Sequence, residues 1–267
     1  YTFSGEDDVL GILSVFLFED GFEGVEELHK QLQAYHKSSL PIDALSVATK
    51  NFMELNGIEF YTETVTDQNW NAIWESSFQP IEVGNQVQVR ASHHPPAGFT
   101  YDILIEPKMS FGTGHHATTY LVLEEMLQHD LKGKSILDFG TGTGLLAILA
   151  EKMGAESIFG IDIDPNCIEN TKENFELNKC TRCQFELGDL DLAERNRYDF
   201  ILANVNRNAL LDRIDRLCAL LAPGGHLFLS GFFPEDVVHF KTALQDKSYR
   251  CTKEQQRDKW MLLVINH

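Results

Sequence analysis

The chain has 267 residues, of which 43% are hydrophobic, and this is enough apolar material for two domains with buried cores. It contains no run of 18 apolar residues and no N-terminal secretory pattern, so a membrane-spanning class is not expected; its five thinly spread cysteines indicate a reduced, cytoplasmic protein. The net charge of −18 argues against direct binding of nucleic acid, whose phosphates it would repel, and favours a basic partner.

The first 65 residues are predicted to form a small α+β domain. Strand, helix and turn signals follow one another in five segments: 1–3 (strand), 6–19 (helix), 25–37 (two strands), 38–57 (helix) and 58–65 (strand). Ser39 is expected to cap the second helix. The resulting order βαββαβ is typical of a ferredoxin-like fold.

This domain also carries a large share of the negative charge. Residues 1–65 contain twelve Asp and Glu but only three lysines, which gives −9, half of the net charge in about a quarter of the chain. The acidic surface either keeps the protein soluble or faces a basic protein. We therefore expect any protein partner to bind at this end.

Residues 66–99 are interpreted as a connection. Residues 67–78 place Trp70, Ile73, Trp74 and Phe78 on one helical face, a pattern that favours packing against a neighbouring domain over stacking on a ligand. Residues 87–91 and 101–107 then read as a strand pair around a proline-stiffened loop. His93 and His94 are expected to point apart in an extended chain, so no metal site is predicted.

Residues 100–267 show a regular alternation of short apolar strands and helices of 9–14 residues. Such a rhythm predicts an α/β fold: a parallel, doubly wound sheet with helices on both faces. Residues 250–266 instead read as a C-terminal antiparallel hairpin. Because an open α/β sheet binds its ligand at the carboxyl ends of the strands, the candidate site lies in the loops there.

The loop in ILDFGTGTG, residues 136–144, follows a strand directly and opens a helix. Gly140 and Gly142 leave backbone N–H groups exposed, and Asp162 ends the next strand 22 residues after Gly140, an interval suited to a carboxylate on a ribose. The spacing G-x-G-x-G differs from the dinucleotide pattern and follows an acid, Asp138. A cofactor with a sulfonium and an amino-acid tail therefore fits better than NAD, although a nicotinamide-dependent oxidoreductase stays open as an alternative.

At these residues the chain resembles the Rossmann-like, S-adenosylmethionine-dependent methyltransferases. The resemblance implies that Asp162 binds the ribose, that Gly140 and Gly142 lie beside the methionine part, and that Asp189 of LGD lies near the adenine. It covers about residues 117–267.

A narrower resemblance begins earlier, at PKMSFGTGHHATT (residues 107–119), and continues in GIDIDP, NTKENFELN, DFILANV and LAPGGHLFLSGF. These segments are similar to the PrmA family, the bacterial methyltransferases of large-subunit ribosomal protein eleven. The family implies a substrate-recognition domain at 1–65, a connection at 66–99 and a methyltransferase domain at 100–267. It also implies methylation of lysine side chains and an N-terminal amine of that basic protein. We expect the enzyme to be a monomer.

Carried over by position, the family's cofactor contacts fall on Thr119, Gly140, Asp162 and Asn204. Thr119 either caps its helix or reaches the cofactor's carboxylate, and Asn204 either ends a strand as a turn residue or aims the attacking amine. His116 matches the family histidine and either acts in catalysis or fixes its loop. The loop at 111–119 would close over the methionine end as a lid.

The chain departs from the family pattern at Lys108 and at Asn206, Arg207 and Asn208, which puts the acceptor rather than the cofactor in doubt. A methyltransferase with a different protein or small-molecule acceptor, and a non-catalytic ribosome-associated module, are therefore alternatives. Cys180 and Cys183 are interpreted as free thiols because a structural zinc needs four ligands.

Overall fold

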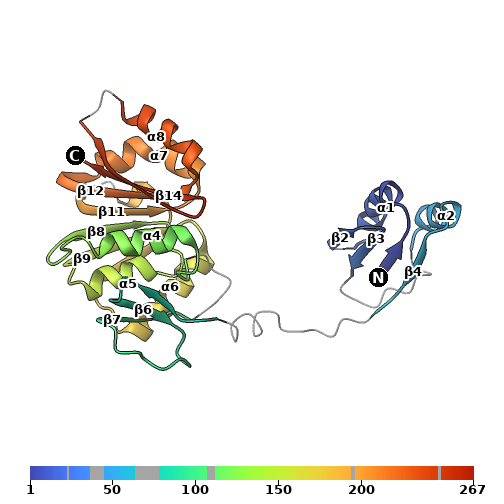
Figure 1. Ribbon diagram of the computed structural model, residues 1–267, viewed down its shortest axis with the longest axis horizontal. Helices are drawn as coiled ribbons and strands as arrows, with labels where there is room; N and C mark the ends of the chain where they lie inside the picture. Colours follow the sequence, from blue (N-terminus) through green and yellow to red (C-terminus); the bar gives the residue numbers. More distant parts are fainter. Residues whose placement is uncertain (23, 37–44, 64–77, 107–111, 194–195, 246–247) are drawn as a thin grey trace. The chain divides into compact units, whose positions relative to one another are not determined.

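The computed structural model describes residues 1–22, 24–36, 45–63, 78–106, 112–193, 196–245 and 248–267. The chain divides into two compact units, Tyr1–Asn69 and Trp70–His267, each considered by itself (Figure 1). None of the helices in the described ranges has the length and apolar character needed to cross a bilayer.

The N-terminal unit has the predicted βαββαβ order. Its elements are β1 (Thr2–Ser4), α1 (Asp7–Glu19), β2 (Gly24–Leu28), β3 (Gln31–Tyr35), α2 (Val47–Leu55) and β4 (Glu59–Tyr61). The antiparallel sheet runs β2-β3-β1-β4, with β1 between two partners. Both helices bury apolar residues against this sheet around Phe3, which is fully buried. The small antiparallel domain expected from the sequence is confirmed.

The second helix starts later than predicted. Ser46 is its N-cap and accepts a hydrogen bond from the Thr49 backbone N–H at 3.1 Å, whereas Ser39 lies outside the described residues. Asp20, at the end of α1, accepts from the Thr49 hydroxyl at 2.6 Å and from the Ser46 N–H at 3.1 Å. The Ser46 cap satisfies a backbone N–H that the start of the helix leaves unpaired. The two bonds to Asp20 tie the end of α1 to the start of α2.

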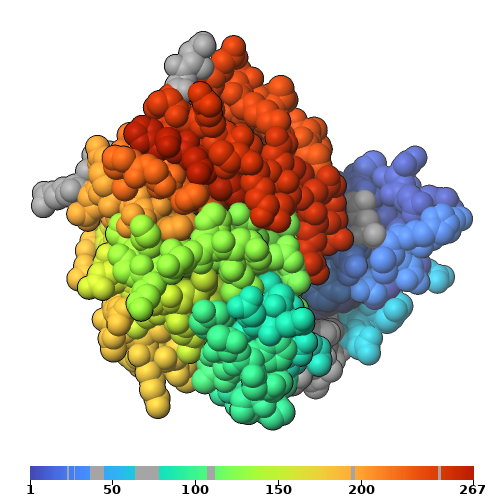
Figure 2. Space-filling view, turned by 60° about the vertical axis from the view of Figure 1, so that its left-hand side comes forward, coloured from blue at the N-terminus to red at the C-terminus, as the bar shows by residue number. Residues whose placement is uncertain are grey.

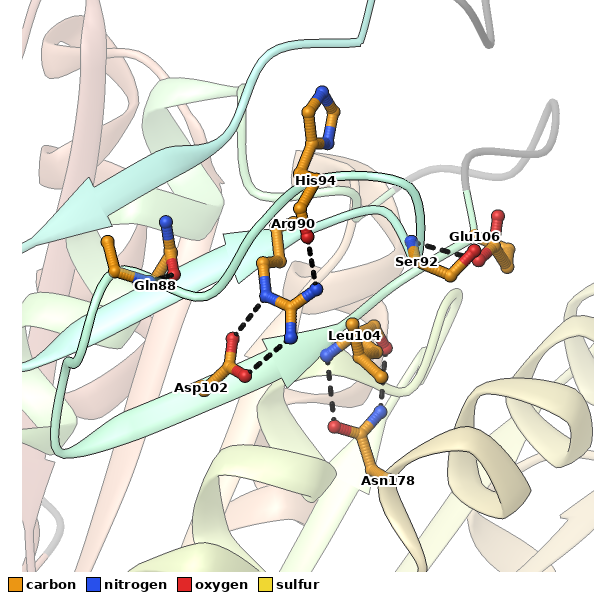
Figure 3. Close-up of polar contacts among 9 residues, drawn as sticks. Gln88, Arg90, Ser92, His94, Asp102, Leu104, Glu106 and Asn178 are labelled. Carbon is orange, nitrogen blue, oxygen red and sulfur yellow. Dashed lines mark hydrogen bonds and ion pairs between the residues drawn. The ribbon is translucent and has the colours of Figure 1, made fainter.

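The C-terminal unit opens with a three-stranded sheet, β5 (Ile81–Val83), β6 (Val87–Arg90) and β7 (Tyr101–Leu104). The predicted strand pair is β6 and β7, which run parallel, while β5 was not predicted. Figure 3 shows how the intervening loop is held: the Arg90 guanidinium donates to both oxygens of Asp102 at 2.7 Å and to the His94 carbonyl at 2.6 Å. A guanidinium that donates to both oxygens of a carboxylate is held in a defined orientation and has its charge balanced.

The expectation that His93 and His94 point apart is wrong. Their ring centroids lie 4.0 Å apart, because the chain turns at these residues instead of running extended. The predicted helix face of Trp70, Ile73 and Trp74 lies outside the described residues. Phe78, at its end, is buried and packs edge-on against the His115 ring at 4.7 Å.

Side chains of the helix α6 (Pro165–Asn178) cover the outer edge of β7. The Asn178 amide accepts from the Leu104 N–H at 3.0 Å and donates to the Leu104 carbonyl at 2.6 Å (Figure 3). Asn174 accepts from the Glu106 N–H at 3.1 Å and donates to the Thr143 carbonyl at 2.9 Å. The helix thus supplies the partners that a further strand would supply.

The central sheet has seven strands in the order β10-β9-β8-β11-β12-β14-β13. The strands are β8 (Ser135–Phe139), β9 (Ser157–Asp162), β10 (Cys183–Leu187), β11 (Tyr198–Asn204), β12 (Leu221–Phe232), β13 (Arg250–Arg257) and β14 (Trp260–Asn266). All neighbours are parallel except the pairs that involve β14. The predicted doubly wound sheet with its antiparallel C-terminal hairpin is confirmed. β12 begins earlier than predicted and includes residues 222–225.

Helices cover both faces of this sheet, as continuous apolar strands require. One buried cluster contains residues of α4 (Ala117–Met126), α5 (Leu145–Lys152) and α6, and the other contains residues of α7 (Arg207–Ala219) and α8 (Val237–Leu244). Figure 2 shows α4 (green) between the C-terminal hairpin (red) and the β5–β7 sheet (teal). Because β8 lies between β9 and β11, strand order reverses there and the site opens beside it.

Candidate active site

A cavity of about 440 Å³ lies at the carboxyl ends of β8, β9, β10 and β11. Its volume falls in the range of small-molecule sites. Six of the predicted site residues line it: His116, Gly140, Gly142, Asp162, Asp189 and Asn204. Thr119 does not, because its side chain is buried behind the cavity wall. The structure therefore brings together residues that lie up to 88 positions apart in the chain.

The loop after β8 lets backbone form the cavity floor. Gly140 has a φ of +75°, and a Cβ at this position would lie 2.2 Å from the Cγ1 atom of Val205. Its N–H donates to the Ile161 carbonyl at 2.9 Å. Only glycine meets both the positive φ and the close approach, so this position requires it.

Asp162 joins the loop to the end of the next strand. Its Oδ2 atom accepts from the Gly142 N–H at 2.9 Å, and its Oδ1 atom accepts from the Asp164 N–H at 3.0 Å. An ionised carboxylate has about four acceptor sites, so each oxygen retains capacity toward the cavity. This matches a carboxylate that receives two hydroxyl groups of a ribose.

Asp138 is buried behind the same loop. Its Oδ2 atom accepts from the Thr141 hydroxyl at 2.9 Å, while its Oδ1 atom has no hydrogen-bond partner among the described residues. Burial, with a smaller contribution from the nearby negative charge of Asp162, raises the pKa of Asp138 to about 7. Near neutral pH the carboxyl group therefore holds a proton in part of the molecules.

Asn204 ends β11 and faces the cavity. Its Nδ2 group donates to the Thr119 hydroxyl at 3.2 Å, whereas its buried Oδ1 atom has no hydrogen-bond partner among the described residues. An unpaired buried acceptor is costly, so such an atom in a cavity wall points to a donor on a ligand. The hydrogen bond to Thr119 fixes the orientation of the Asn204 amide and leaves its Oδ1 atom without a partner among the described residues.

His116 caps α4 next to the cavity. Its Nδ1 atom lies 2.8 Å from the Thr118 hydroxyl and 3.4 Å from the Thr118 backbone nitrogen, and its ring packs edge-on against Trp260 at 4.6 Å. Burial, and then the positive charge of Lys259, lowers its pKa. A neutral ring whose Nδ1 is engaged with Thr118 is the arrangement expected of a loop-fixing histidine.

The two glycine-rich loops are in contact. The Thr143 hydroxyl, in the second loop, donates to the Gly112 carbonyl, in the first, at 2.8 Å. Gly112 and Gly114 have φ values of +100° and +95°. Residues 107–111, including Lys108, lie outside the described ranges. The first loop is thus anchored on the second at Gly112.

The other departures from the family pattern have structural partners. Asn206 caps α7, since its side chain accepts from the Ala209 N–H at 3.0 Å. Arg207 forms an ion pair with Asp236 at 2.6 Å and donates to the Asn208 side chain at 3.0 Å. Of these residues only Asn206 lines the cavity.

Asp189 follows β10 and is held by an arginine that sequence reasoning missed. Arg213, on α7, donates from Nε to both carboxylate oxygens at 3.0 Å and from Nη2 to Oδ2 at 2.6 Å. The Arg213 hydrogen bonds are the main cause of the lowered pKa of Asp189. No local pattern signals this contact, because the two residues lie 24 positions apart on different elements. Further lining residues that were not predicted are Phe139, Ile161, Ile163, Val205 and Trp260.

The chain is similar to known proteins over nearly its whole length. The chain is 38% identical to the ribosomal protein L11 methyltransferase of Phocaeicola vulgatus over 95% of this chain and 92% of that protein. It is 39% identical to the one of Porphyromonas gingivalis over 94% of this chain and 89% of that protein. It also resembles the crystal structure of the ribosomal protein L11 methylase from Lactobacillus delbrueckii subsp. bulgaricus, with a TM-score of 0.65 and 26% identity, over 70% of this chain and 98% of that one.

Residues 13–267 match the family described as Ribosomal protein L11 methyltransferase (PrmA). The fold, the glycine loop and the carboxylate that ends the next strand are those expected from the resemblance noted in the sequence. The chain therefore belongs to the ribosomal protein L11 methyltransferase (PrmA) family.

Proposed function

We propose that the protein transfers methyl groups from S-adenosylmethionine to lysine side chains and the N-terminal amine of ribosomal protein L11. The observation that carries the proposal is Asn204, which lines the cavity and whose buried Oδ1 atom has no hydrogen-bond partner among the described residues. Family membership supports the acceptor, and the cavity supports the cofactor.

The residues of the cavity fit this cofactor. Asp162 has acceptor capacity for the ribose hydroxyls, and the surface beside Gly140 and Gly142, which a Cβ at Gly140 would fill, suits the methionine part. Asp189 lies at the end of the neighbouring strand, where the adenine is expected. When bound, the cofactor supplies a methyl group on a positively charged sulfur.

The acceptor amine must lose a proton before it can attack. A lysine with a pKa of about 10.4 is mostly an ammonium at neutral pH, and a poorly hydrated pocket beside a second positive charge lowers that pKa. The proton leaves to water. The Asn204 Oδ1 atom then accepts a hydrogen bond from the neutral amine and aims its lone pair. Held by Asp162 and the glycine loop, the cofactor would supply its methyl group to this lone pair, and the electron pair of its C–S bond would leave with the sulfur as a neutral thioether.

Asn204 acts here by position rather than as a base. A hydrogen bond between an amide oxygen and a charged or partly charged donor is worth about 1.5–3 kcal/mol, which corresponds to a factor of about 10–150 in rate. We propose that His116 and the first glycine loop exclude water around this contact. Thr119 contributes through Asn204.

The N-terminal domain, residues 1–65, is proposed to recognise the ribosomal protein. Its charge of −9 complements a basic partner, and the connection at residues 66–99 presents the bound protein to the catalytic domain at 100–267. The enzyme would then act in the cytoplasm, where ribosomal proteins are synthesised.

The direct test uses the purified protein, labelled S-adenosylmethionine and unmethylated ribosomal protein L11, with mass spectrometry to locate the modified amines. We expect labelled lysine and N-terminal positions. Asn204→Ala should lower turnover at saturating cofactor by about 10–150-fold while the cofactor's dissociation constant changes by less than about 3-fold. No label on the ribosomal protein, with label on another added acceptor, would refute the proposed substrate.

A further inference from the structure

The carboxylate of Asp189 is engaged mainly by a charged donor group. Its Oδ1 atom accepts from the Leu190 N–H at 2.7 Å and from Arg213 Nε at 3.0 Å, and its Oδ2 atom accepts from Arg213 Nε at 3.0 Å and Nη2 at 2.6 Å. A carboxylate offers about four acceptor sites. Three N–H groups make these contacts, because the Arg213 Nε–H is shared between the two oxygens, and two of the three belong to a charged guanidinium. An exocyclic amine of a ligand would have to compete with this charged fork.

Asp162, at the same end of the sheet, has a different kind of hydrogen-bond partner. Each of its oxygens accepts one backbone N–H, and the other neighbour with a donor is the Cys167 thiol, which donates weakly. The donors to Asp162 are neutral, whereas Asp189 is held by a charged guanidinium, so Asp162 is the carboxylate that a ligand can engage more easily. Since both residues line the cavity, the difference lies in their partners rather than in their access.

Arg213 also lines the cavity, and it is not saturated. It uses its Nε–H and one Nη2–H on Asp189, which leaves three of the five guanidinium N–H groups for other acceptors. The paired fork holds the guanidinium in one plane, and both side chains are less than a third exposed, at 29% and 28%. The group is therefore a fixed donor surface in the cavity wall.

A second arginine–aspartate pair on the same helix supports the orientation of Arg213. Arg216, one turn after Arg213, pairs with Asp191 in the short helix that follows Asp189. Both arginines thus tie α7 to the turn after β10. Only Arg213 reaches the cavity, which makes Arg216 a matched control on the same helix.

We propose that Arg213 is the residue that binds the adenine and that Asp189 is its positioning residue. This deepens the proposed function and rests on it. Adenine offers ring nitrogens as acceptors besides its amine, and a guanidinium donates to such nitrogens or lies flat on the ring. Recognition then depends on the ring nitrogens and the ring face, while the 6-amino group contributes little.

The test measures binding by calorimetry, so it does not depend on turnover. Wild-type protein is titrated with S-adenosylhomocysteine, with adenosine and with purine riboside, which lacks only the 6-amino group. Purine riboside should bind within about 3-fold of adenosine. A loss of 10-fold or more in the wild type, absent from Asp189→Asn, would show that Asp189 receives the amine and would overturn the proposal.

The variants distinguish the residue that contacts the adenine from the residue that positions it. Arg213→Ala and Arg213→Lys should each weaken adenosine at least 10-fold, since lysine lacks the fork. Asp189→Asn should weaken adenosine in the presence of Arg213 but add nothing to Arg213→Ala. Arg216→Ala should leave adenosine affinity within 2-fold.

Unchanged adenosine binding in a folded Arg213→Lys protein would refute the role of Arg213 but leave the proposed function standing. The purine riboside comparison needs only the wild type and Asp189→Asn, so it can still refute the proposal if the arginine variants unfold. Wild-type protein that binds neither S-adenosylhomocysteine nor adenosine would instead remove the proposed function itself, and this inference with it.

Discussion

Replacing Gly140 by alanine should damage the cavity. A second glycine, Gly224, is a control that separates the effect of a close contact from the effect of backbone strain. Gly140 and Gly224 both have a φ of +75°, but a Cβ at Gly224 meets no atom within 4 Å, whereas at Gly140 it would lie 2.2 Å from Val205 Cγ1. A residue with a side chain costs about 1–2 kcal/mol in this conformation. Both variants share that cost.

The additional cost at Gly140 comes from the contact with Val205. Carbon atoms prefer separations of about 3.5–4.0 Å, so the alanine methyl or Val205 must move by more than an ångström. Overpacking of this kind costs about 1–3 kcal/mol. Gly224→Ala should therefore lower the melting temperature of the catalytic unit by about 2–8 °C, and Gly140→Ala by about 4–20 °C.

Calorimetry of S-adenosylhomocysteine binding completes the comparison. Because Val205 lines the cavity, Gly140→Ala should weaken binding at least 10-fold, and Gly224→Ala should leave it unchanged. Adding Val205→Ala to Gly140→Ala removes the clashing methyl group and should recover part of the lost melting temperature. Equal melting temperatures and equal affinities for the two glycine variants would refute the close-approach argument.

Three further changes test other contacts. Thr119→Val should lower turnover about 3–10-fold through Asn204 with little change in cofactor affinity, and Thr119→Ser should restore it, as measured by steady-state kinetics. Asp102→Ala should cost about 3 kcal/mol in unfolding free energy, because it leaves the Arg90 guanidinium buried without its partner; chemical denaturation that shows no loss would contradict this. The raised pKa of Asp138, about 7, means that the folded state holds a proton that the unfolded state releases, so stability should fall as pH rises from about 4 to 7. Asp138→Asn should flatten this dependence in thermal unfolding curves.

Much of the site was accessible from the sequence because its signals are local. A strand, a glycine turn, a helix and a second strand that ends in an acid follow one another within about 25 residues, and this spacing predicted Gly140, Gly142 and Asp162 at one edge of the sheet. The regular rhythm of strands and helices predicted the doubly wound sheet, and the break in that rhythm at residues 250–266 predicted the hairpin.

The remainder depends on contacts that spacing does not encode. The rotation of α4 about its axis determines whether Thr118 or Thr119 reaches the cavity. His116 fixes this rotation, because as the N-cap it sets the start of the helix at Ala117. The strand β5 is three residues long, too short for periodicity to indicate. The pairing of Asp189 with Arg213 joins a turn to a distant helix, so it becomes visible only once α7 is packed.

The asparagine ladder of α6 has a consequence for the solution behaviour of the protein. Asn174 and Asn178 occupy the hydrogen-bonding positions along β7 that a strand from another molecule would otherwise use. An outer strand of a sheet is a common starting point for self-association. The amides of α6 cover this edge at Leu104 and, just beyond the strand, at Glu106, so a strand of a neighbouring molecule would have to displace them before it could pair there.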